Sequence, residues 1–431
     1  MRPIYSLLFL ALLPFILVRI YLKGRAQPAY RERIGERLGL YDGPAPKIAP
    51  MWIHAVSVGE CEASFPLVRR LQAAWPDLPI LMTCTTPTGS SRIQTVLGDT
   101  VFHVYLPYDL PWITRRFLRY FRPRIGIIME TEIWPNLFAG AREAKIPLMI
   151  ANGRLSERSV RGYERLSSLI KPSLSAVHCI AAQSEQDTTR YKRIGANEGS
   201  VRNCGNIKFD IAWDVEQAKA SQALKSAWFA ERKVIVAGST HPGEEILVLR
   251  AFKRVRDRFP DALMVMVPRH PERGQSVIEL CCAEGLNPLL FSETHDLPVD
   301  NDVLVIDRIG ELRRFYGACQ VAFIGGSLVP HGGQNPLEPL VAKIPVIFGP
   351  HMTNFKEIRN SILEVKAGVE VRSESELSEQ LIFLLENSLT AKSMGERGEL
   401  MVHQNQGAVT RIYELTAELI HQSASSSSGS K

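Results

Sequence analysis

The chain has 431 residues, of which 45% are hydrophobic and 22% are charged, and its formal net charge is +6 at pH 7. This composition is typical of a folded protein and excludes an intrinsically disordered one, while the length predicts two domains. The modest positive charge suits an anionic ligand or a membrane surface. Because the sequence has no dense basic stripe and no nucleic-acid-binding motif, we expect no nucleic-acid partner.

The amino-terminal segment is almost wholly apolar from Ile4 to Val18, and basic residues follow it. A cleaved signal peptide would carry its charge before the apolar stretch and a small-residue cleavage site after it. A soluble core helix is the second alternative, since Pro14 and the short length are unusual for a full membrane span. We interpret residues 1–25 as an uncleaved anchor in the cell inner membrane, with the rest of the chain on the cytoplasmic side.

Short apolar segments with the character of buried strands alternate with helical patterns after the anchor. The predicted strands are Trp52–Val56, Pro79–Thr83, Val101–Tyr105, Ile125–Met129, Leu148–Ala151, Val177–Ala181, Val201–Cys204, Val234–Ala237, Ala262–Val267, Val303–Ile306, Val321–Ile324 and Val346–Phe348. Two consecutive series of this kind predict an α/β protein with two Rossmann-like, doubly wound domains facing a central cleft.

The interval between the two series has no strong strand pattern, so we place the domain connection there. The expected organisation is an anchor at 1–25, an N-terminal acceptor-binding domain at 26–210, a linker at 211–230, a C-terminal nucleotide-binding domain at 231–420 and a disordered serine-rich tail at 421–431. The last helical pattern, at 408–420, is long enough to return to the first domain.

The stretch MWIHAVSVGE, residues 51–60, changes from a strand to a glycine turn and then to the first turn of a helix. Ligands in parallel sheets bind beyond the carboxyl ends of the strands. Glu60 is therefore either a helix-start residue favoured by the helix dipole or a catalytic base. Glu130 and Arg154 also follow predicted strands, and Lys208 lies near the predicted hinge.

The second series carries glycine-rich and basic loops after its strands. Gly325, Gly326 and Ser327 form either a tight turn or a site where backbone N–H groups approach a phosphate, and we favour the phosphate site. Arg269 and His270 lie in a proline-bounded loop after another strand, where arginine suits a phosphate. Further candidates follow in the loops Asp307–Glu311 and Gln334–Pro339, where Asn335 is a good helix cap and Glu338 suits ribose hydroxyls.

Two other patterns have simpler explanations. Asp300-Asn301-Asp302 spells the D-x-D of metal-dependent sugar transferases, but it precedes its strand, so we interpret it as a solvated turn. The basic residues Arg115, Arg116, Arg119, Arg122 and Arg124 form either a solvated helix face or a surface for phosphates on an acidic lipid or the membrane. We assign Arg115, Arg116 and Arg119, together with Arg154, to binding of an acceptor.

Long motifs in order resemble the family of 3-deoxy-D-manno-octulosonic acid (Kdo) transferases. The matching stretches are SVGE at 57–60, LPYDLP at 106–111, METEIWPN at 129–136, IANGRLSERS at 150–159, NIKFD at 206–210, GSTHPGEE at 238–245, PRHPERG at 268–274, GGSLVPHGGQNPLEP at 325–339 and NQGA at 405–408. The likeness extends from the anchor to near residue 415. Ile133, where many members carry leucine, is a small departure.

The resemblance implies a GT-B glycosyltransferase fold and inverting transfer of Kdo from CMP-Kdo to the lipid A precursor, lipid IVA, without a metal or other cofactor. It implies that Glu60 is the general base and that Glu130 and Lys208 support the transition state. The implied contacts to CMP are Pro268, Arg269, Ile309, Gly310, Glu311, Asn335, Pro336, Leu337 and Glu338.

Two rival functions stay open from the sequence. A nucleotide-sugar epimerase has the same two-domain architecture but a soluble substrate, and the predicted anchor argues against it. A lipid-tethered binding protein with two α/β lobes would be exported and processed, which the amino terminus does not favour.

Overall fold

The computed structural model describes residues 1–229, 232–294 and 300–428, with side chains as far as residue 422. The chain forms two compact units, the first comprising Met1–Asp210 and the segment from Gln406 onwards, and the second comprising Ile211–Asn405. Residues 230–231, where the predicted linker meets the predicted C-terminal domain, and residues 429–431 of the predicted tail lie outside the described residues.

Unit 1 contains a parallel sheet in the order β3-β2-β1-β4-β5-β6-β7. Its strands are β1 (Met51–His54), β2 (Ile80–Cys84), β3 (Phe102–Tyr105), β4 (Ile125–Met129), β5 (Leu148–Gly153), β6 (Val177–Ala182) and β7 (Val201–Asn203). His54 of β1 is in register with Thr83 of β2 and with Ile128 of β4. The central strands are buried on both faces, which explains their continuous apolar runs.

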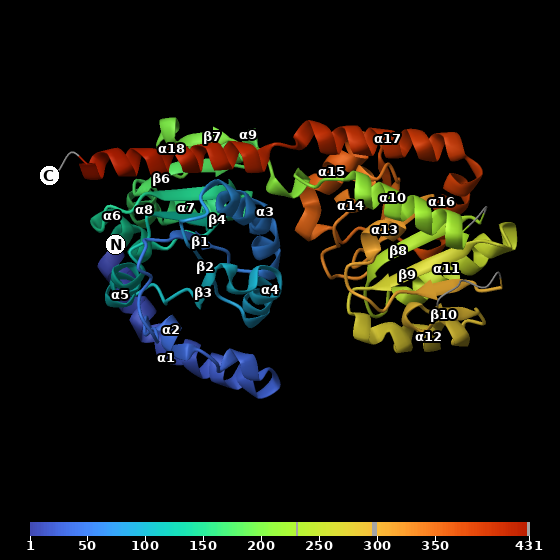
Figure 1. Cartoon of the computed structure of the whole chain (residues 1–431), viewed down its shortest axis with the longest axis horizontal. Helices are drawn as coiled ribbons and strands as arrows, with labels where there is room; N and C mark the ends of the chain where they lie inside the picture. The colour runs from blue at the N-terminus through green and yellow to red at the C-terminus, as the bar shows by residue number, and fades with distance from the viewer. Residues whose placement is uncertain (230–231, 295–299, 429–431) are drawn as a thin grey trace. The chain divides into compact units, whose positions relative to one another are not determined.

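Helices cover both faces of this sheet. One face packs against α3 (Val58–Ala74), α4 (Pro87–Leu97) and α18 (Ala408–Ser428), and the other packs against α5 (Pro111–Phe121), α6 (Pro135–Glu143), α7 (Glu157–Arg165), α8 (Ser167–Leu174) and α9 (Glu185–Arg193). The red helix α18 lies along unit 1 in Figure 1. The Asp210 carboxylate accepts the N–H groups of Gly407 and Val409, so an acidic side chain from the end of the first segment caps α18.

The helix α1 (Arg2–Ala26) extends from unit 1 and is followed by η1 (Pro28–Tyr30) and α2 (Ile34–Arg37). Its first turns contact the body of the unit, where Ser6 hydrogen-bonds Asn136 and the ring of Phe9 lies 6.3 Å from that of Tyr108. Many of its apolar side chains are exposed, including Phe15 at 72%. Within the described residues, α1 is the one helix that is long and apolar enough to cross a membrane.

Unit 2 contains a second parallel sheet in the order β10-β11-β9-β8-β12-β13-β14. Its strands are β8 (Val234–Thr240), β9 (Leu263–Pro268), β10 (Pro288–Leu290), β11 (Val303–Val305), β12 (Val321–Ile324), β13 (Val346–Phe348) and β14 (Gly368–Glu370). A core cluster joins this sheet to α11 (Glu245–Arg258), α12 (Gly274–Ala283), α16 (Glu374–Glu386) and α17 (Ser388–Asn405). The remaining helices of the unit are α10 (Val215–Leu224), α13 (Leu312–Tyr316), α14 (Leu337–Val341) and α15 (Lys356–Glu364).

The two parallel sheets confirm the predicted fold class, and every predicted strand is present. Strands β10 and β14, which have three residues each and form the two edges of the second sheet, were not predicted from the sequence. The expectation of a solvated turn at residues 300–302 is wrong for Asn301 and for Asp302, which are both buried. The Asp302 carboxylate pairs with Arg256 at 2.8 Å and accepts the N–H of Asn287 at 2.9 Å.

Candidate active site

The middle of the unit 1 sheet is the point where the strand order reverses direction. Strand β1 lies between β2 and β4, so the chain winds outwards in opposite directions from the β1–β4 pair. Open α/β sheets bind ligands outside the carboxyl ends of the strands at such a switch point. Glu60 follows β1 and Glu130 follows β4, and the fold therefore brings these two predicted residues to the same place.

Glu60 lies in the first turn of α3, whose N-cap is Ser57. One carboxylate oxygen accepts the N–H of Val56 at 2.8 Å, and the other accepts the hydroxyl of Ser57 at 3.1 Å. Each oxygen keeps a further lone pair, because a carboxylate offers about four acceptor positions. Glu60 forms no ion pair with any residue in the described part of the chain. The side chain is thus fixed in orientation and still able to accept a proton.

The surroundings of Glu60 favour its protonated form. The pKa of Glu60 is raised to about 7: burial has the largest effect, the N–H of Val56 lowers the pKa, and the charges of Glu130 and Glu132 raise it. A general base works best when its pKa is near the operating pH. The alternative of a simple helix-start residue does not explain three carboxylates placed together at the switch point.

The turn after β4 is held by the protein backbone and by two tyrosines. Glu130 has a left-handed backbone with φ of 55°, and its carbonyl accepts the hydroxyl of the fully buried Tyr191 at 3.0 Å. The hydroxyl of Tyr163 donates to the Thr131 carbonyl at 3.4 Å. Burial also raises the pKa of Glu132. A non-glycine residue in this conformation requires support from its surroundings, which the tyrosines supply.

Arg154 and Lys208 belong to neighbouring loops of the same sheet edge. Arg154 follows β5, and its carbonyl accepts the hydroxyl of Thr131. Lys208 lies in η4 (Ile207–Phe209) after β7, and its neighbour Ile207 packs in the same core cluster as Cys61, the residue after Glu60. Both cationic residues therefore follow strands at the same end of the unit 1 sheet as Glu60.

The corresponding switch point of unit 2 lies between β8 and β12. The Gly325–Ser327 turn follows β12, and its amide groups point to a carboxylate of the protein itself. Glu244, which is fully buried, accepts the N–H groups of Gly326 at 2.7 Å, Ser327 at 3.0 Å and Leu328 at 2.9 Å. The expectation that these amides bind a phosphate is wrong, because the Glu244 carboxylate already accepts their hydrogen bonds.

Close packing explains the glycine at position 325, and the backbone conformation explains the glycine at position 326. A side chain at Gly325 would lie 2.2 Å from the backbone oxygen of Ser239, and Gly326 has φ of 66°. The nearby hydroxyl of Ser327 accepts the N–H of Gly349 at 2.8 Å. The glycine turn therefore joins the ends of three strands and presents the side chains around it.

Histidines gather beside this turn. The ring of His241 stacks on that of His331 at 4.3 Å and lies 6.3 Å from that of His270, and its Nε2 atom is 3.0 Å from the amide nitrogen of Gln334. Burial and then the other two histidines lower the pKa of His241 to about 4, so its ring is neutral at pH 7. Arg269 also contributes to this lowering, which places a permanent cation near the same ring.

The remaining predicted donor residues lie at the carboxyl end of the second sheet. Pro268 ends β9, and the exposed Arg269 and His270 follow it. Ile309 is 84% exposed, next to Gly310, whereas Glu311 pairs with Arg314 at 2.6 Å. Before α14, the Asn335 side chain accepts the N–H of Leu337 at 3.1 Å and donates to Glu338 at 3.3 Å, with Pro336 between them. The prediction that Asn335 is the N-cap of this helix is wrong, because the N-cap of α14 is Pro336, and the Asn335 side chain instead holds the turn before it.

Three of the predicted acceptor residues lie away from the carboxyl ends of the unit 1 strands. They are Arg115, Arg116 and Arg119. They are on α5, which runs back towards the amino ends of the strands, and Arg115 pairs with Glu143 at 2.9 Å. The predicted acceptor residues therefore separate into Arg154, at the same end of the sheet as Glu60, and the three arginines of α5.

Three polar residues of the two switch points escaped the sequence analysis: Glu132, Glu244 and His241. Glu132 is in the METE motif, two residues after the predicted Glu130. His241 and Glu244 both follow β8 in the motif GSTHPGEE, so the signal was their position after a strand. Their partners are more than 80 residues away along the chain, and no local spacing indicates such contacts.

Solved structures with the same arrangement define the class of this protein as a two-domain GT-B fold. A glycosyltransferase from Rickettsia africae aligns with a TM-score of 0.54 at 14% identity, covering 86% of this chain and 99% of its own. The UDP-GlcNAc 2-epimerase from Neisseria meningitidis aligns with a TM-score of 0.53 at 13% identity, covering 86% and 100%. At these identities the likeness establishes the fold alone.

The family follows from sequence relatives. Residues 32–211 match the family model described as 3-deoxy-D-manno-octulosonic-acid transferase (kdotransferase). The chain is 39% identical to the 3-deoxy-D-manno-octulosonic acid transferase of Haemophilus influenzae, over 96% of this chain and 97% of that protein. It is 33% identical to that of Bordetella pertussis, over 96% and 98%. The chain belongs to the 3-deoxy-D-manno-octulosonic acid transferase family and is a glycosyltransferase, as the motifs predicted.

Proposed function

We propose that this enzyme transfers Kdo from CMP-Kdo to a hydroxyl of lipid IVA with inversion at the anomeric carbon, and that Glu60 is the general base. The observation that carries the proposal is the state of Glu60: it is oriented by Val56 and Ser57, and its pKa is raised to about 7. A base with this pKa is partly deprotonated at neutral pH and can take the proton of an attacking alcohol.

The proposed reaction is a single displacement. The acceptor oxygen forms the new bond to the anomeric carbon while the bond to the CMP oxygen breaks, and Glu60 receives the hydroxyl proton. Glu130 and Lys208 are proposed to stabilise the charge that develops at the sugar. The CMP leaving group carries negative charge, which fixed cations and N–H dipoles stabilise without the need for a metal.

We propose that unit 2 binds CMP-Kdo. The exposed Arg269 and the neutral His241 lie at the carboxyl ends of adjacent strands, where an anionic ligand binds in this type of sheet. The loop at Ile309–Glu311 and the capped segment at Asn335–Glu338 are at the same sheet edge. In this proposal they recognise the nucleotide, whereas the Glu244 carboxylate keeps the Gly325–Ser327 turn in shape.

The acceptor is a lipid, and α1 suits it as an anchor at the inner membrane. Its exposed apolar side chains would cost free energy in water and gain it in a bilayer. We propose that both units lie on the cytoplasmic side, where the basic residues after α1 are favoured.

Mass spectrometry of the products tests the proposal. Purified protein is incubated with CMP-Kdo, with and without lipid IVA, in the presence of EDTA. We expect lipid IVA to gain Kdo, CMP to be released in step with it, and EDTA to have no effect. A modified sugar nucleotide formed without the lipid would instead support the epimerase alternative, and activity that is lost in EDTA and restored by Mg²⁺ would contradict transfer without a metal.

A further inference from the structure

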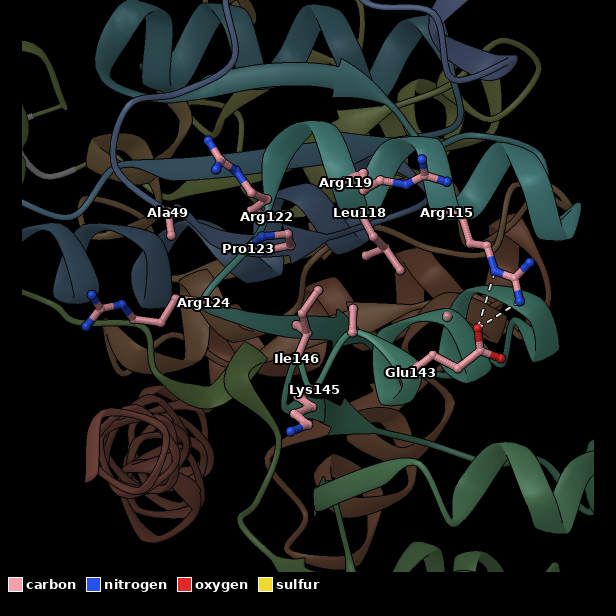
Figure 2. Close-up of a pocket in the computed structure, with 12 residues that line it drawn as sticks. Ala49, Arg115, Leu118, Arg119, Arg122, Pro123, Arg124, Glu143, Lys145 and Ile146 are labelled. Atoms are coloured by element: carbon pink, nitrogen blue, oxygen red, sulfur yellow. Dashed lines mark hydrogen bonds and ion pairs between the residues drawn. The ribbon is translucent and has the colours of Figure 1, made fainter. Parts of the chain in front are cut away.

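A cavity lies in unit 1 between α5 and α6, with a volume of about 590 Å³. Figure 2 shows Leu118 and Ile146 at its centre and charged side chains around them. These two apolar residues are buried. The cavity therefore has an apolar floor and a charged rim, a combination that suits an amphiphile better than a free ion.

The rim is strongly basic. Its cationic side chains are Arg115, Arg119, Arg122, Arg124 and Lys145, and its acidic side chain is Glu143. Glu143 pairs with Arg115 at 2.9 Å and with Arg2 of α1 at 3.6 Å. The other four cations are exposed and have no ion-pair partner in the described part of the chain. Exposed side chains of the same charge on the rim of one cavity repel one another, and an anion bound among them would reduce this repulsion.

The cavity lies at the opposite end of the unit 1 strands from Glu60. Ala49 lies just before β1, Arg124 directly before β4 and Ile146 shortly before β5, so the cavity surrounds the amino ends of these strands. A five-residue strand such as β4 spans about 16 Å. A ligand in the cavity is thus too far from the carboxyl ends of the strands to be the group that reacts there.

A smaller groove lies between α1 and the start of α5. It has a volume of about 360 Å³ and is lined by apolar residues that include Leu7, Leu10, Pro111 and Trp112. Arg2 lines this groove and also pairs with Glu143 on the rim of the larger cavity. An apolar groove, an exposed apolar helix and a basic rim are therefore contiguous, which matches the order of acyl chain and phosphate in a membrane lipid.

We propose that the rim binds the phosphate of an anionic glycerophospholipid of the phosphatidylglycerol type, which is not a substrate. The acyl region of this lipid lies along the groove beside α1, and its phosphate displaces Glu143 from Arg115. The proposal goes beyond the transfer reaction, and its test requires neither CMP-Kdo nor an acceptor, so it fails or succeeds independently of the proposed function.

Flotation with vesicles tests this site on the full-length protein. Binding is compared on phosphatidylcholine vesicles with and without ~20% phosphatidylglycerol, because each basic residue near an anionic surface contributes measurably to binding. The pocket variant combines Arg119→Gln, Arg122→Gln and Lys145→Gln. We expect it to bind the phosphatidylglycerol vesicles at least about tenfold more weakly than wild type, while its binding to pure phosphatidylcholine, which depends on α1, is unchanged.

A matched variant separates a specific site from the general surface charge. Arg69→Gln, Arg165→Gln and Lys192→Gln remove the same charge from exposed, unpaired positions on α3, α7 and α9. This variant should keep most of the preference for phosphatidylglycerol. Equal losses in the two triple variants would overturn the proposal. Thermal melting of both variants checks the fold, and we expect no change because the substituted side chains are exposed.

Glu143→Gln gives a test of opposite sign. It removes the acid that competes with the lipid phosphate for Arg115, so we expect binding to phosphatidylglycerol vesicles to strengthen by several-fold. Weaker binding of this variant would contradict the displacement step. Millimolar inorganic phosphate is the competing ligand: if it abolishes the preference for phosphatidylglycerol, the cavity is a free-phosphate site and the lipid assignment is wrong.

Discussion

Both units place a glutamate after the first strand of their sheet, and they use it in opposite ways. Glu60 after β1 accepts one backbone N–H and one hydroxyl, and it is only half-buried. Glu244 after β8 is fully buried and accepts four backbone N–H groups, including that of His241 at 3.2 Å. The first carboxylate has remaining capacity for a proton, whereas the second is committed to holding a turn together.

The difference shows that position in a fold does not define the role of a residue. A switch point concentrates loops and helix starts in both units, but the number of internal N–H donors decides what a carboxylate there can do. Burial raises the pKa of both groups, and the N–H groups oppose this rise at Glu244. Substitutions at Glu60 and Glu244 therefore distinguish a chemical role from a structural one.

The largest expected effect is on Glu60. Glu60→Gln keeps a carbonyl oxygen for the N–H of Val56 but cannot accept the acceptor proton. We therefore expect transfer to fall by about 10²- to 10⁴-fold, while CMP affinity, a property we assign to unit 2, stays unchanged. Initial rates and calorimetric titration with CMP measure the two quantities. The control is Glu62→Gln, which changes an exposed neighbour paired with Arg92 and should keep its activity. Full activity of Glu60→Gln, or an equal loss in both variants, would contradict the assignment of Glu60 as the base.

A large effect on stability is expected at Glu244. Glu244→Ala leaves four amide groups of the turn without their acceptor, and we expect the free energy of unfolding to fall by at least about 3 kcal/mol. Denaturation in urea measures it. Glu279→Ala removes an exposed acid from α12 of the same unit and should change stability by less than about 0.5 kcal/mol. Similar values for the two variants would mean that the carboxylate is dispensable for the turn.

The smallest effect is a shift in pH dependence. Since Glu60 must be deprotonated to act, kcat/KM should rise with pH through about 7, the pKa of Glu60. Glu132→Gln removes a negative charge that raises this pKa, so the rise should move to lower pH. Glu62→Gln should leave the profile in place. A profile that stays fixed in Glu132→Gln, or moves to higher pH, would show that these carboxylates are not coupled in solution.

The raised pKa of Glu60 affects stability in the opposite direction to activity. A carboxyl group whose pKa is higher in the folded state binds its proton more tightly there than in the unfolded chain. Its contribution to stability is complete below the unfolded pKa of about 4.3 and is lost as pH rises towards 7. The deprotonated state of Glu60, which we propose for catalysis, is thus its less stable one, as is common where a site is tuned for reaction.

The sequence by itself determined the two doubly wound sheets, the central strands and the family. These features depend on local signals: apolar runs such as Ile125–Met129, turns directly after them and long motifs in order. It also placed Glu60 and Glu130 at strand ends, because a strand followed by a helix fixes the edge of a parallel sheet. The edge strands β10 and β14 lacked such a signal, since they begin with proline and glycine and are only partly buried, so neither forms a continuous apolar run.

Only the tertiary structure decided how the polar groups are paired. The N–H groups of Gly326–Leu328 donate to Glu244, which lies more than 80 residues earlier in the chain. The basic cavity combines α5, α6 and the segments before β1, β4 and β5. Spacing along the chain carries no information on contacts between segments that meet only after folding. Whether a carboxylate or an arginine is free for a ligand depends on those contacts, and therefore function required the folded chain.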